Sequence, residues 1–441
     1  MKQGFSGGIS IPPAQENKQM TSGLPVEGFA PDTLVIPLKQ SPGAACLPAV
    51  KAGDAVLAGQ AVGTPAEENG VPVHCGVSGT VLAVEDRPGP FGDALSVVVV
   101  NDHRQTPAPP LTVSRNRQGL LMLMRQAGLI GMGGAGFPTF IKYQTERHIT
   151  DLLINGSECE PYLTCDDRLM TFEAARVASG AAALAEATGN EQIRIHLCVE
   201  ANKNEAVTRM KEAARSLRNM AVEVLPHRYP QGGERQLIRA VLGREIPAGR
   251  LPADAGVLVS NVATAAAMAD ALDGVPLTHR IVTVSGAVAR PANIRVPVGT
   301  LFADLLTHCG GLSAEARASG VKPLFVAGGP MTGKALDNLQ LPVIKTSSGL
   351  LALPERDIDE RNCIRCGGCA RVCPSRLMPF AIDAAVIAGE AETCADYRAD
   401  QCIACGCCSW ICPAGRRLAT RVSMARLGVR ARLRRDAAHA K

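Results

Sequence analysis

Two short runs near the C-terminus hold the residues with the clearest chemistry. Each run has four cysteines in the spacing C-x2-C-x2-C-x3-C and a proline after the fourth; the members are Cys363, Cys366, Cys369 and Cys373 in the first run and Cys402, Cys405, Cys408 and Cys412 in the second. This spacing binds cubane iron–sulfur clusters, because three thiolates surround one cluster and the fourth ligates the other. It therefore predicts two [4Fe–4S] clusters, one on the first three cysteines of the first run with Cys412, and one on the first three of the second run with Cys373.

Structural zinc and disulfide bonds are the alternatives for these cysteines. Zinc sites usually take two cysteine pairs separated by a longer loop, whereas each run places four cysteines within eleven residues. Disulfide frameworks belong to short secreted chains. Because the whole motif occurs twice, we favour iron–sulfur clusters over both.

The composition describes a multidomain protein without a nucleic-acid signature. A chain of 441 residues is long enough for about three domains. Its hydrophobic content of 46% supports real cores, which must be aliphatic because aromatic residues make up only 3%. The net charge of +5 is modest for this length and gives no argument for nucleic-acid binding.

The compartment is inferred from the cysteines and from the hydrophobic stretches. Of the sixteen cysteines, half lie in the two runs, and cysteines used in this way indicate a reducing compartment. The first eleven residues lack the apolar core of a signal peptide. The best candidate for a membrane span, Gly119–Phe137, is interrupted by Arg125 and Gln126 and is rejected. We expect a cytoplasmic protein that reaches the membrane only through partners or a surface segment.

The pattern of strands, helices and turns predicts a multidomain chain of α/β plus α+β class. Residues 1–104 are β-rich and look like the barrel-sandwich of biotinyl and lipoyl carriers, but Ala61–Val71 lacks the lysine that a swinging arm needs, so a structural role is favoured. The expected units are a barrel-sandwich at 1–104, a Rossmann-like α/β domain at 111–275, a helical dicluster domain of ferredoxin type at 354–415 and a basic segment at 416–441. Between them, residues 276–330 hold a hairpin-like pair, Arg280–Gly286 and Ala292–Pro297, and look like a ubiquitin-like SLBB module.

The α/β domain is predicted from strands that alternate with helices, which implies a parallel sheet. The expected strands are Asp151–Ile154, Ile193–Val199, Val222–Leu225 and Gly256–Ser260, and the expected helices are Arg117–Leu129, Phe172–Thr188, Lys203–Leu217 and Val262–Leu272. Near the C-terminus, Arg421–Arg435 carries six arginines and no acid. We interpret it as a basic amphipathic helix that is either simply solvated or used on a partner or an anionic surface.

A glycine-rich loop, Gly131–Gly136, is the main ligand-binding signal of the α/β domain. It follows a helix rather than a strand, so it is not the usual dinucleotide fingerprint. Without Cβ atoms, its backbone lets a phosphate or a planar ring approach. Lys142 follows closely, and Asn155–Pro161 places polar groups directly after a strand, where open α/β sheets bind ligands.

The order of four motifs carries a resemblance to known proteins. The motifs are Gly131–Thr139 with Lys142, Asn155–Pro161, Tyr229–Glu234 and Asn261–Thr264. Together they resemble the FMN- and NADH-binding subunit of respiratory complex I. With the barrel before them and the cysteine runs after them, they look like the C subunit of the Rnf electron-transport complex, over residues from about 4 to 415.

The resemblance implies cofactors, site residues and partners. FMN would be held by Gly131, Gly133, Gly134, Lys142, Asn155, Glu158, Gly232, Gly233, Asn261 and Thr264, and the nicotinamide nucleotide would face Phe137, Glu160 and Glu234. No side chain is assigned a role in covalent or acid–base catalysis. The implied partners are the other Rnf subunits, both membrane and ferredoxin-type, with ferredoxin reached indirectly. The implied place is the cytoplasmic face of the inner membrane, held there peripherally.

Electron counting requires a flavin between NADH and the iron–sulfur clusters. NADH gives two electrons as a hydride, a cubane cluster takes one, and a flavin can accept the pair and release single electrons. Together with this chemistry, the resemblance implies an NADH-dependent oxidoreductase that is part of a complex exchanging electrons between NAD and ferredoxin and coupling this to ion transport. Two alternatives remain: a soluble cobalamin reductase of the microcompartment type, in which the barrel follows the clusters, and a non-catalytic ferredoxin-like scaffold.

Overall fold

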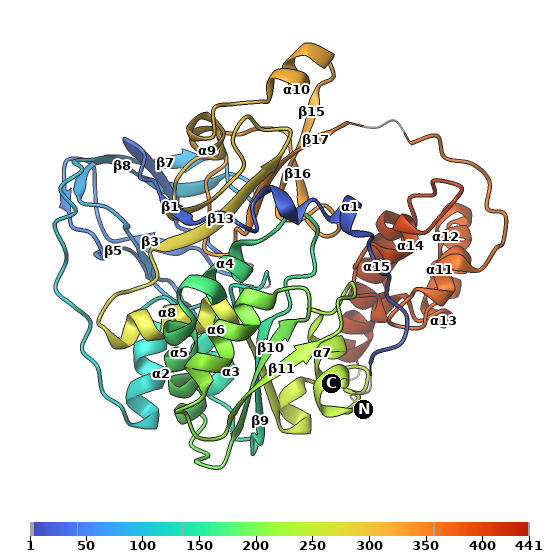
Figure 1. Cartoon of the computed structure of the whole chain (residues 1–441), viewed down its shortest axis with the longest axis horizontal. Coiled ribbons are helices and arrows are strands. Elements are labelled where there is room, and N and C mark those ends of the chain that lie inside the picture. Colours follow the sequence, from blue (N-terminus) through green and yellow to red (C-terminus); the bar gives the residue numbers. More distant parts are fainter. Residues whose placement is uncertain (1–3, 42, 135, 356–357, 440–441) are drawn as a thin grey trace.

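The computed structural model describes residues 4–41, 43–134, 136–355 and 358–439 (Figure 1). Ala135, inside the predicted glycine-rich loop, lies outside the described residues, as do a few positions within the expected units 1–104, 354–415 and 416–441. Two β-rich units lie on one side of an α/β domain, and a bundle of helices near the C-terminus lies beside it (Figure 1).

The α/β domain is built on a fully parallel sheet, as predicted. Its strands are β9 (Asp151–Gly156), β10 (Arg194–Glu200), β11 (Met220–Leu225) and β12 (Val257–Asn261), in the order β11-β10-β9-β12. Both faces of the sheet are buried. Leu152 and Ile154 point to one core, and Leu153 points to the other, which follows from the two-residue period of a strand.

Helices cover both faces of this sheet. One face carries α2 (Arg117–Gln126), α5 (Ala174–Glu186), α6 (Asn204–Ala214) and α8 (Val262–Leu272), and the other carries α7 (Glu234–Leu242). Helix α8 has the predicted bounds. It approaches α5 closely at Gly180, where an added Cβ would lie 1.7 Å from the Ala265 carbonyl oxygen.

The helix predicted over Phe172–Thr188 is wrong at its start. The structure has α4 (Cys165–Phe172) before α5, with a break at Glu173, whose φ of −129° is not helical. Helix α4 begins seven residues before the predicted helix because the distant side chain of Glu158 accepts hydrogen bonds from its first N–H groups.

The N-terminal β unit is a barrel-sandwich of two antiparallel sheets around an aliphatic core. The sheets are β2 (Thr33–Pro37), β8 (Ala94–Asn101), β7 (Gly79–Arg87) and β4 (Ala55–Val56) in one, and β3 (Cys46–Pro48), β5 (Ala61–Pro65) and β6 (Val73–His74) in the other.

A six-stranded mixed sheet forms the second β unit. It contains the antiparallel pair β13 (His279–Gly286) and β14 (Ala292–Pro297), together with β15 (Pro323–Ala327), β16 (Lys334–Leu336), β17 (Gly349–Pro354) and β1 (Val26–Gly28). Both edge strands, β1 and β16, and the central β17 come from outside 276–330, so this sheet draws on the chain before the barrel and after the module. Helix α9 (Phe302–His308) packs on it.

The cysteine-rich region is helical, as expected. It contains α11 (Gly368–Arg371), α12 (Pro379–Ala388), α13 (Ala391–Asp396), α14 (Cys407–Trp410) and the long α15 (Leu418–His439). The buried side chains Val422, Ala425 and Val429 of α15 share a core with Ile382 of α12. In the part of the chain that the structure describes, no helix combines the length and the apolar character that a membrane crossing requires.

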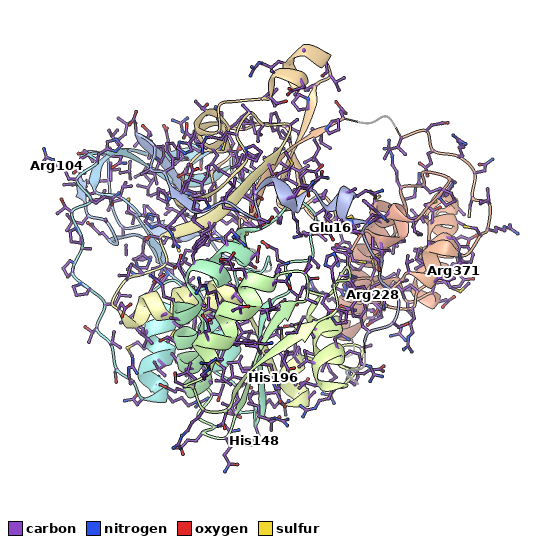
Figure 2. All side chains as sticks on the ribbon, viewed as in Figure 1. Glu16, Arg104, His148, His196, Arg228 and Arg371 are labelled. Atoms are coloured by element: carbon purple, nitrogen blue, oxygen red, sulfur yellow. The ribbon has the colours of Figure 1, made fainter. Side chains whose placement is uncertain are left out.

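The N-terminal segment joins the units. It includes α1 (Pro13–Glu16) and a 3-10 turn at Lys18–Met20. Figure 1 shows it passing the cysteine-rich helices before it reaches the six-stranded sheet, and Figure 2 shows Glu16 between these two units.

Candidate functional site

The carboxyl edge of the parallel sheet gathers three of the four sequence motifs. Asn155 and Asn261, at the carboxyl ends of β9 and β12, are register partners. The Asn261 amide lies 3.4 Å from the Asn155 carbonyl oxygen, and the Asn155 amide donates to the Gly232 carbonyl oxygen at 2.9 Å. This edge is where open α/β sheets bind ligands.

The glycine-rich loop lies against the start of α8. The Met132 N–H donates to Thr264 Oγ1 at 3.0 Å, and a Cβ on Gly133 would lie 3.3 Å from the Asn261 Cβ. A Cβ on Gly134 would meet open space, and its φ of +116° suits glycine. The accessible backbone beside a helix N-terminus fits the phosphate and ring of a flavin.

Lys142 and Glu234 meet at the same edge of the domain. Lys142, on α3 (Thr139–Tyr143), has its Nζ 3.2 Å from Glu234 at the start of α7, and it also donates to the Val259 carbonyl oxygen. Phe137, which is close to Lys142 in the sequence, leaves half of its side chain exposed, and an open ring face suits a stacking role. Lys142 is thus paired with a predicted nucleotide contact.

Glu158 turns its carboxylate inward. One oxygen accepts from the Asp166 N–H at 2.9 Å and the other from the Asp167 N–H at 3.2 Å, so Glu158 caps α4. Asp166 in turn accepts from the Asn261 amide at 2.7 Å. Burial raises the pKa of both Glu158 and Asp166, and the negative charge of Asp166 acts in the same direction on Glu158. This pair orients Asn261 beside the glycine-rich loop.

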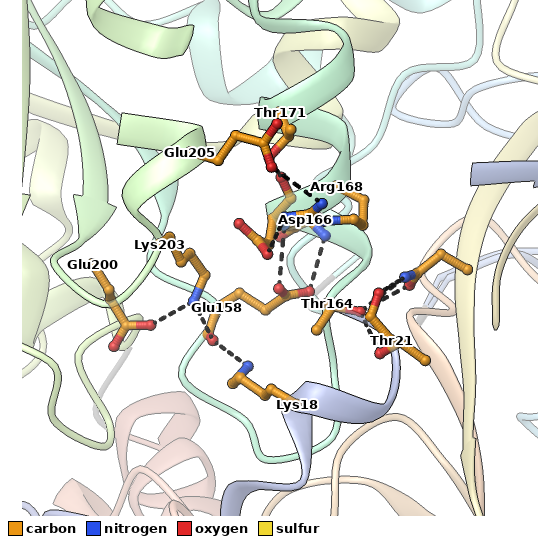
Figure 3. Close-up of polar contacts among 12 residues, drawn as sticks. Lys18, Thr21, Glu158, Thr164, Asp166, Arg168, Thr171, Glu200, Lys203 and Glu205 are labelled. Atoms are coloured by element: carbon orange, nitrogen blue, oxygen red, sulfur yellow. Dashed lines mark hydrogen bonds and ion pairs between the residues drawn. The ribbon is translucent and has the colours of Figure 1, made fainter. Parts of the chain in front are cut away.

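Two buried lysines bind the backbone of the loop that contains Glu158 (Figure 3). Lys203 Nζ lies 3.1 Å and Lys18 Nζ 2.8 Å from the Glu158 carbonyl oxygen, and Lys203 also pairs with Glu200 at 3.0 Å. Burial opposes the charge of Lys203, but Glu200 and Glu158 outweigh it and raise the Lys203 pKa. Burial, with repulsion from Lys203, lowers the pKa of Lys18. Although burial alone would raise it, Lys203 brings the Glu200 pKa down to about 2.

Glu160 points away from Glu158, toward the six-stranded sheet and the cysteines. Its carboxylate accepts from the Met331 N–H at 3.0 Å and from Thr332 Oγ1 at 2.5 Å, and burial raises its pKa. The Tyr229 hydroxyl lies 3.4 Å from Glu160 and donates to the Cys405 carbonyl oxygen at 2.7 Å. The two carboxylates predicted to face the nucleotide, Glu160 and Glu234, therefore have different surroundings.

The structure brings the eight motif cysteines together as two sets of four. One cavity is lined by Cys363, Cys366, Cys369 and Cys412, and a second by Cys373, Cys402, Cys405 and Cys408. Each set takes its fourth member from the other run, and four thiols around one small cavity fit a cubane cluster. Cys363 and Cys366 are exposed, whereas the second set lies beside Tyr229.

The sequence did not single out Asp166, Lys203, Lys18 or the Tyr229 side chain. Lys203 follows the end of β10, so the rule that ligands and polar groups gather at strand ends could have pointed to it. Lys18 and Tyr229 act across 140 and 176 residues of chain, a separation that no local pattern encodes.

Comparison with known families assigns three of the units. Residues 3–105 match the RnfC barrel sandwich hybrid domain, 124–270 match the Nuo51 FMN-binding domain, and 281–338 match the SLBB domain. The predicted fold class is confirmed.

Individual relatives agree with the family matches. The chain is 39% identical to the C subunit of the Na(+)-translocating ferredoxin:NAD(+) oxidoreductase complex of Acetobacterium woodii, over 86% of both chains. It is 37% identical to the C subunit of the proton-translocating complex of Clostridium ljungdahlii, over 86% of this chain and 83% of the relative. It is also 37% identical to the C subunit of the ion-translocating oxidoreductase complex of Rhodobacter capsulatus, over 89% and 77%. The chain therefore belongs to the family of C subunits of ion-translocating ferredoxin:NAD(+) oxidoreductase complexes.

Proposed function

We propose that this chain exchanges electrons between NADH and an iron–sulfur partner protein, through FMN and two [4Fe–4S] clusters, as one part of an ion-translocating complex. The observation that carries the proposal is the contact between Tyr229 and Cys405. It places the set of cysteines around Cys405 directly against the loops at the carboxyl edge of the sheet. In this proposal, the loop that carries Tyr229 therefore lies between the flavin-binding edge of the sheet and the cavity lined by Cys405.

The side chains at this edge bind and orient. The glycine-rich loop offers backbone N–H groups, Asn155 and Asn261 offer amides, and Asp166 fixes the Asn261 amide. Phe137 and Glu234 provide a ring face and a carboxylate for the nucleotide, and Glu160 provides a second carboxylate on the cluster side. Bound FMN supplies the change from hydride to single-electron chemistry.

Burial supports an order for the clusters. The set that includes Cys373 and Cys405 lies against the flavin domain, while Cys363 and Cys366 of the other set are exposed. The cluster on Cys373 and Cys405 is therefore next to the flavin, and the cluster on Cys363 and Cys366 faces a partner.

The partners in this proposal are the membrane and ferredoxin-type subunits of the same complex. Ferredoxin is reached indirectly through them, and the chain is held peripherally at the cytoplasmic face of the membrane. Nucleic acid has no part in this function.

Anaerobic titration with NADH tests the proposal. Protein purified without oxygen and loaded with FMN and iron should lose its flavin absorbance on addition of NADH, and two cluster signals should then appear in the EPR spectrum. Zinc in the thiolate sites, or full clusters that NADH does not reduce, would contradict it and favour a scaffold.

A further inference from the structure

The first segment of the chain, residues 5–23, touches both the cysteine-rich helices and the flavin domain; we name it the N-terminal strap. On the side of the cysteines, the Gly8 N–H donates to the Val372 carbonyl oxygen at 2.8 Å. Gly7 has a φ of +72°, and a Cβ there would lie 2.6 Å from the carbonyl carbon and oxygen of Cys373. The strap thus lies directly against a predicted cluster ligand, with no room for a side chain.

The same residues are paired with the loop that carries Tyr229. Ile9 and Tyr229 exchange two backbone hydrogen bonds, at 2.8 and 2.9 Å. The Phe5 ring lies 5.2 Å from the guanidinium of Arg228, and Ile9 and Tyr229 share an apolar cluster with Cys407. At this point the strap is held between the cysteine-rich helices and the flavin domain.

The far end of the strap holds the loop that contains Glu158. Lys18 Nζ donates to the carbonyl oxygens of Glu158 and Leu163 at 2.8 and 2.5 Å, and Thr21 Oγ1 lies 2.7 Å from Thr164 Oγ1 (Figure 3). Only 9% of Lys18 is exposed. Burying an ammonium group costs free energy unless its hydrogen bonds are made. This end of the strap is therefore held in the one position in which Lys18 makes its hydrogen bonds.

We propose that the N-terminal strap is a positioning element that fixes the spacing between the flavin site and the cluster held by Cys373, Cys402, Cys405 and Cys408. The inference rests on the proposed function. Its physical basis is that one continuous segment is tied to Cys373 at one end and to the flavin-site loop at the other, so the two units cannot separate without breaking these contacts. The rate of electron transfer between two centres falls steeply with the distance between them. A looser strap therefore slows electron transfer from the flavin to this cluster, but leaves the reduction of the flavin by NADH unchanged.

Two glycine substitutions test the proposal. In Gly7→Ala, the new methyl group meets the Cys373 backbone and pushes the strap off the cysteine-rich helices. The matched control is Gly23→Ala, in the same segment, where an added Cβ meets nothing within 4 Å. Three quantities are compared in cluster-loaded, FMN-loaded protein: the rate of flavin bleaching by NADH, the rate at which the cluster EPR signals appear after rapid freezing, and the hydrogen exchange of the peptides around Val372 and Cys405.

The expected result is specific to one step. Gly7→Ala should bleach its flavin at the wild-type rate, reduce its clusters several-fold more slowly and exchange faster around Val372 and Cys405, while Gly23→Ala matches wild type throughout. Equal exchange and equal cluster reduction in all three proteins would overturn the proposal, and so would equal slowing of both steps.

A second variant covers a loss of iron in Gly7→Ala. Thr21→Val removes the contact with Thr164 at the end of the strap opposite to Cys373, and it should cause the same changes in the same direction. No change in Thr21→Val with full iron content would then count against the strap. If NADH fails to reduce the clusters of the wild-type protein, the proposed function fails, while hydrogen exchange still decides whether the strap holds the two units together.

Discussion

The side chain and the backbone of Glu158 stabilise different parts of the site. The carboxylate caps α4, while the carbonyl oxygen accepts from Lys18 and Lys203. All of these groups are buried, so their hydrogen bonds are stronger than at the surface and expensive to break. The polar groups of this loop hold its shape and leave the glycine backbone as the surface open to a ligand.

At the scale of single cysteines, the exchanged fourth ligand leads to a sharp prediction. Cys373 belongs to the first run but lines the cavity of the second. We expect Cys373→Ser to disturb the cluster of Cys402, Cys405 and Cys408, and Cys412→Ser to disturb the other cluster, since each removes one of four thiolates. The EPR spectra of the reduced proteins and their iron content measure this.

The matched comparison is Cys369→Ser, which lies in the same run as Cys373 but lines the other cavity. Its spectrum should resemble that of Cys412→Ser and differ from that of Cys373→Ser. If Cys369→Ser and Cys373→Ser instead lose the same cluster signal, the ligands are not exchanged between the runs.

At the scale of elements, local patterns predicted what local forces determine. The bounds of α8 and the core of each parallel strand follow from apolar periodicity, and the cysteine runs follow from ligand spacing. The start of α4 was missed because a side chain outside the helix caps it. The central strand β17 and the outer strand β1 were missed because they pair with strands far away in the sequence.

The attachment of the N-terminal strap should depend on pH through His227. Its ring is placed between Glu16 of the strap and Glu200, with Nδ1 3.5 Å from Glu200. The close carboxylate of Glu200, helped by the charge of Glu16 and its hydrogen bond with the ring, raises the His227 pKa above its usual 6.5. A raised pKa means that this stabilisation is fully present below about pH 6.5 and is lost as the pH rises through the value in the folded protein.

We therefore expect the protection factors of strap amides, corrected for intrinsic exchange, to fall several-fold from pH 6 to pH 9. In His227→Gln, which cannot be charged, they should be lower at pH 6 and fall less with pH than in the wild-type protein. His196 offers a control on the other side of the domain (Figure 2), where His196→Gln should leave the strap unaffected. A strap with the same protection at both pH values in the wild-type protein would show that the pair does not hold it.

At the scale of the whole molecule, buried lysines mark the places where units meet. Lys345 donates to the carbonyl oxygens of Pro72, from the barrel, and Gly128, after α2, at 2.8 Å each. Burial lowers its pKa to about 8. Lys18 occupies a comparable junction between the strap and the flavin domain. At Lys345, backbone carbonyl groups of two units converge on one ammonium group, whereas at Lys18 the ammonium group of the strap binds two carbonyl groups of the flavin domain. In both places directed hydrogen bonds fix the relative position of the parts that they join.

Helix α15 packs against the other cysteine-rich helices and is not a separate basic tail. Arg426 donates to the Cys402 carbonyl oxygen at 3.3 Å, Arg430 donates to the Asp400 carbonyl oxygen, and Arg421 pairs with Asp383 at 2.9 Å. These arginines stabilise the cysteine-rich helices. Removing the whole segment would therefore disturb the cysteine-rich helices as well as any surface contact, and a test of docking must use the exposed arginines near its end.

Arg434 and Arg435 are exposed on this last part of α15 and are the residues through which we expect the chain to dock on its membrane partners. The double variant Arg434→Gln/Arg435→Gln should reduce the fraction of the chain that sediments with membranes several-fold, and moderate salt should reduce wild-type sedimentation in the same way, because exposed charges are screened. The control is Arg215→Gln/Arg218→Gln, which removes the same charge from exposed positions after α6. Equal sedimentation of both double variants and the wild-type protein would place the docking surface elsewhere on the molecule.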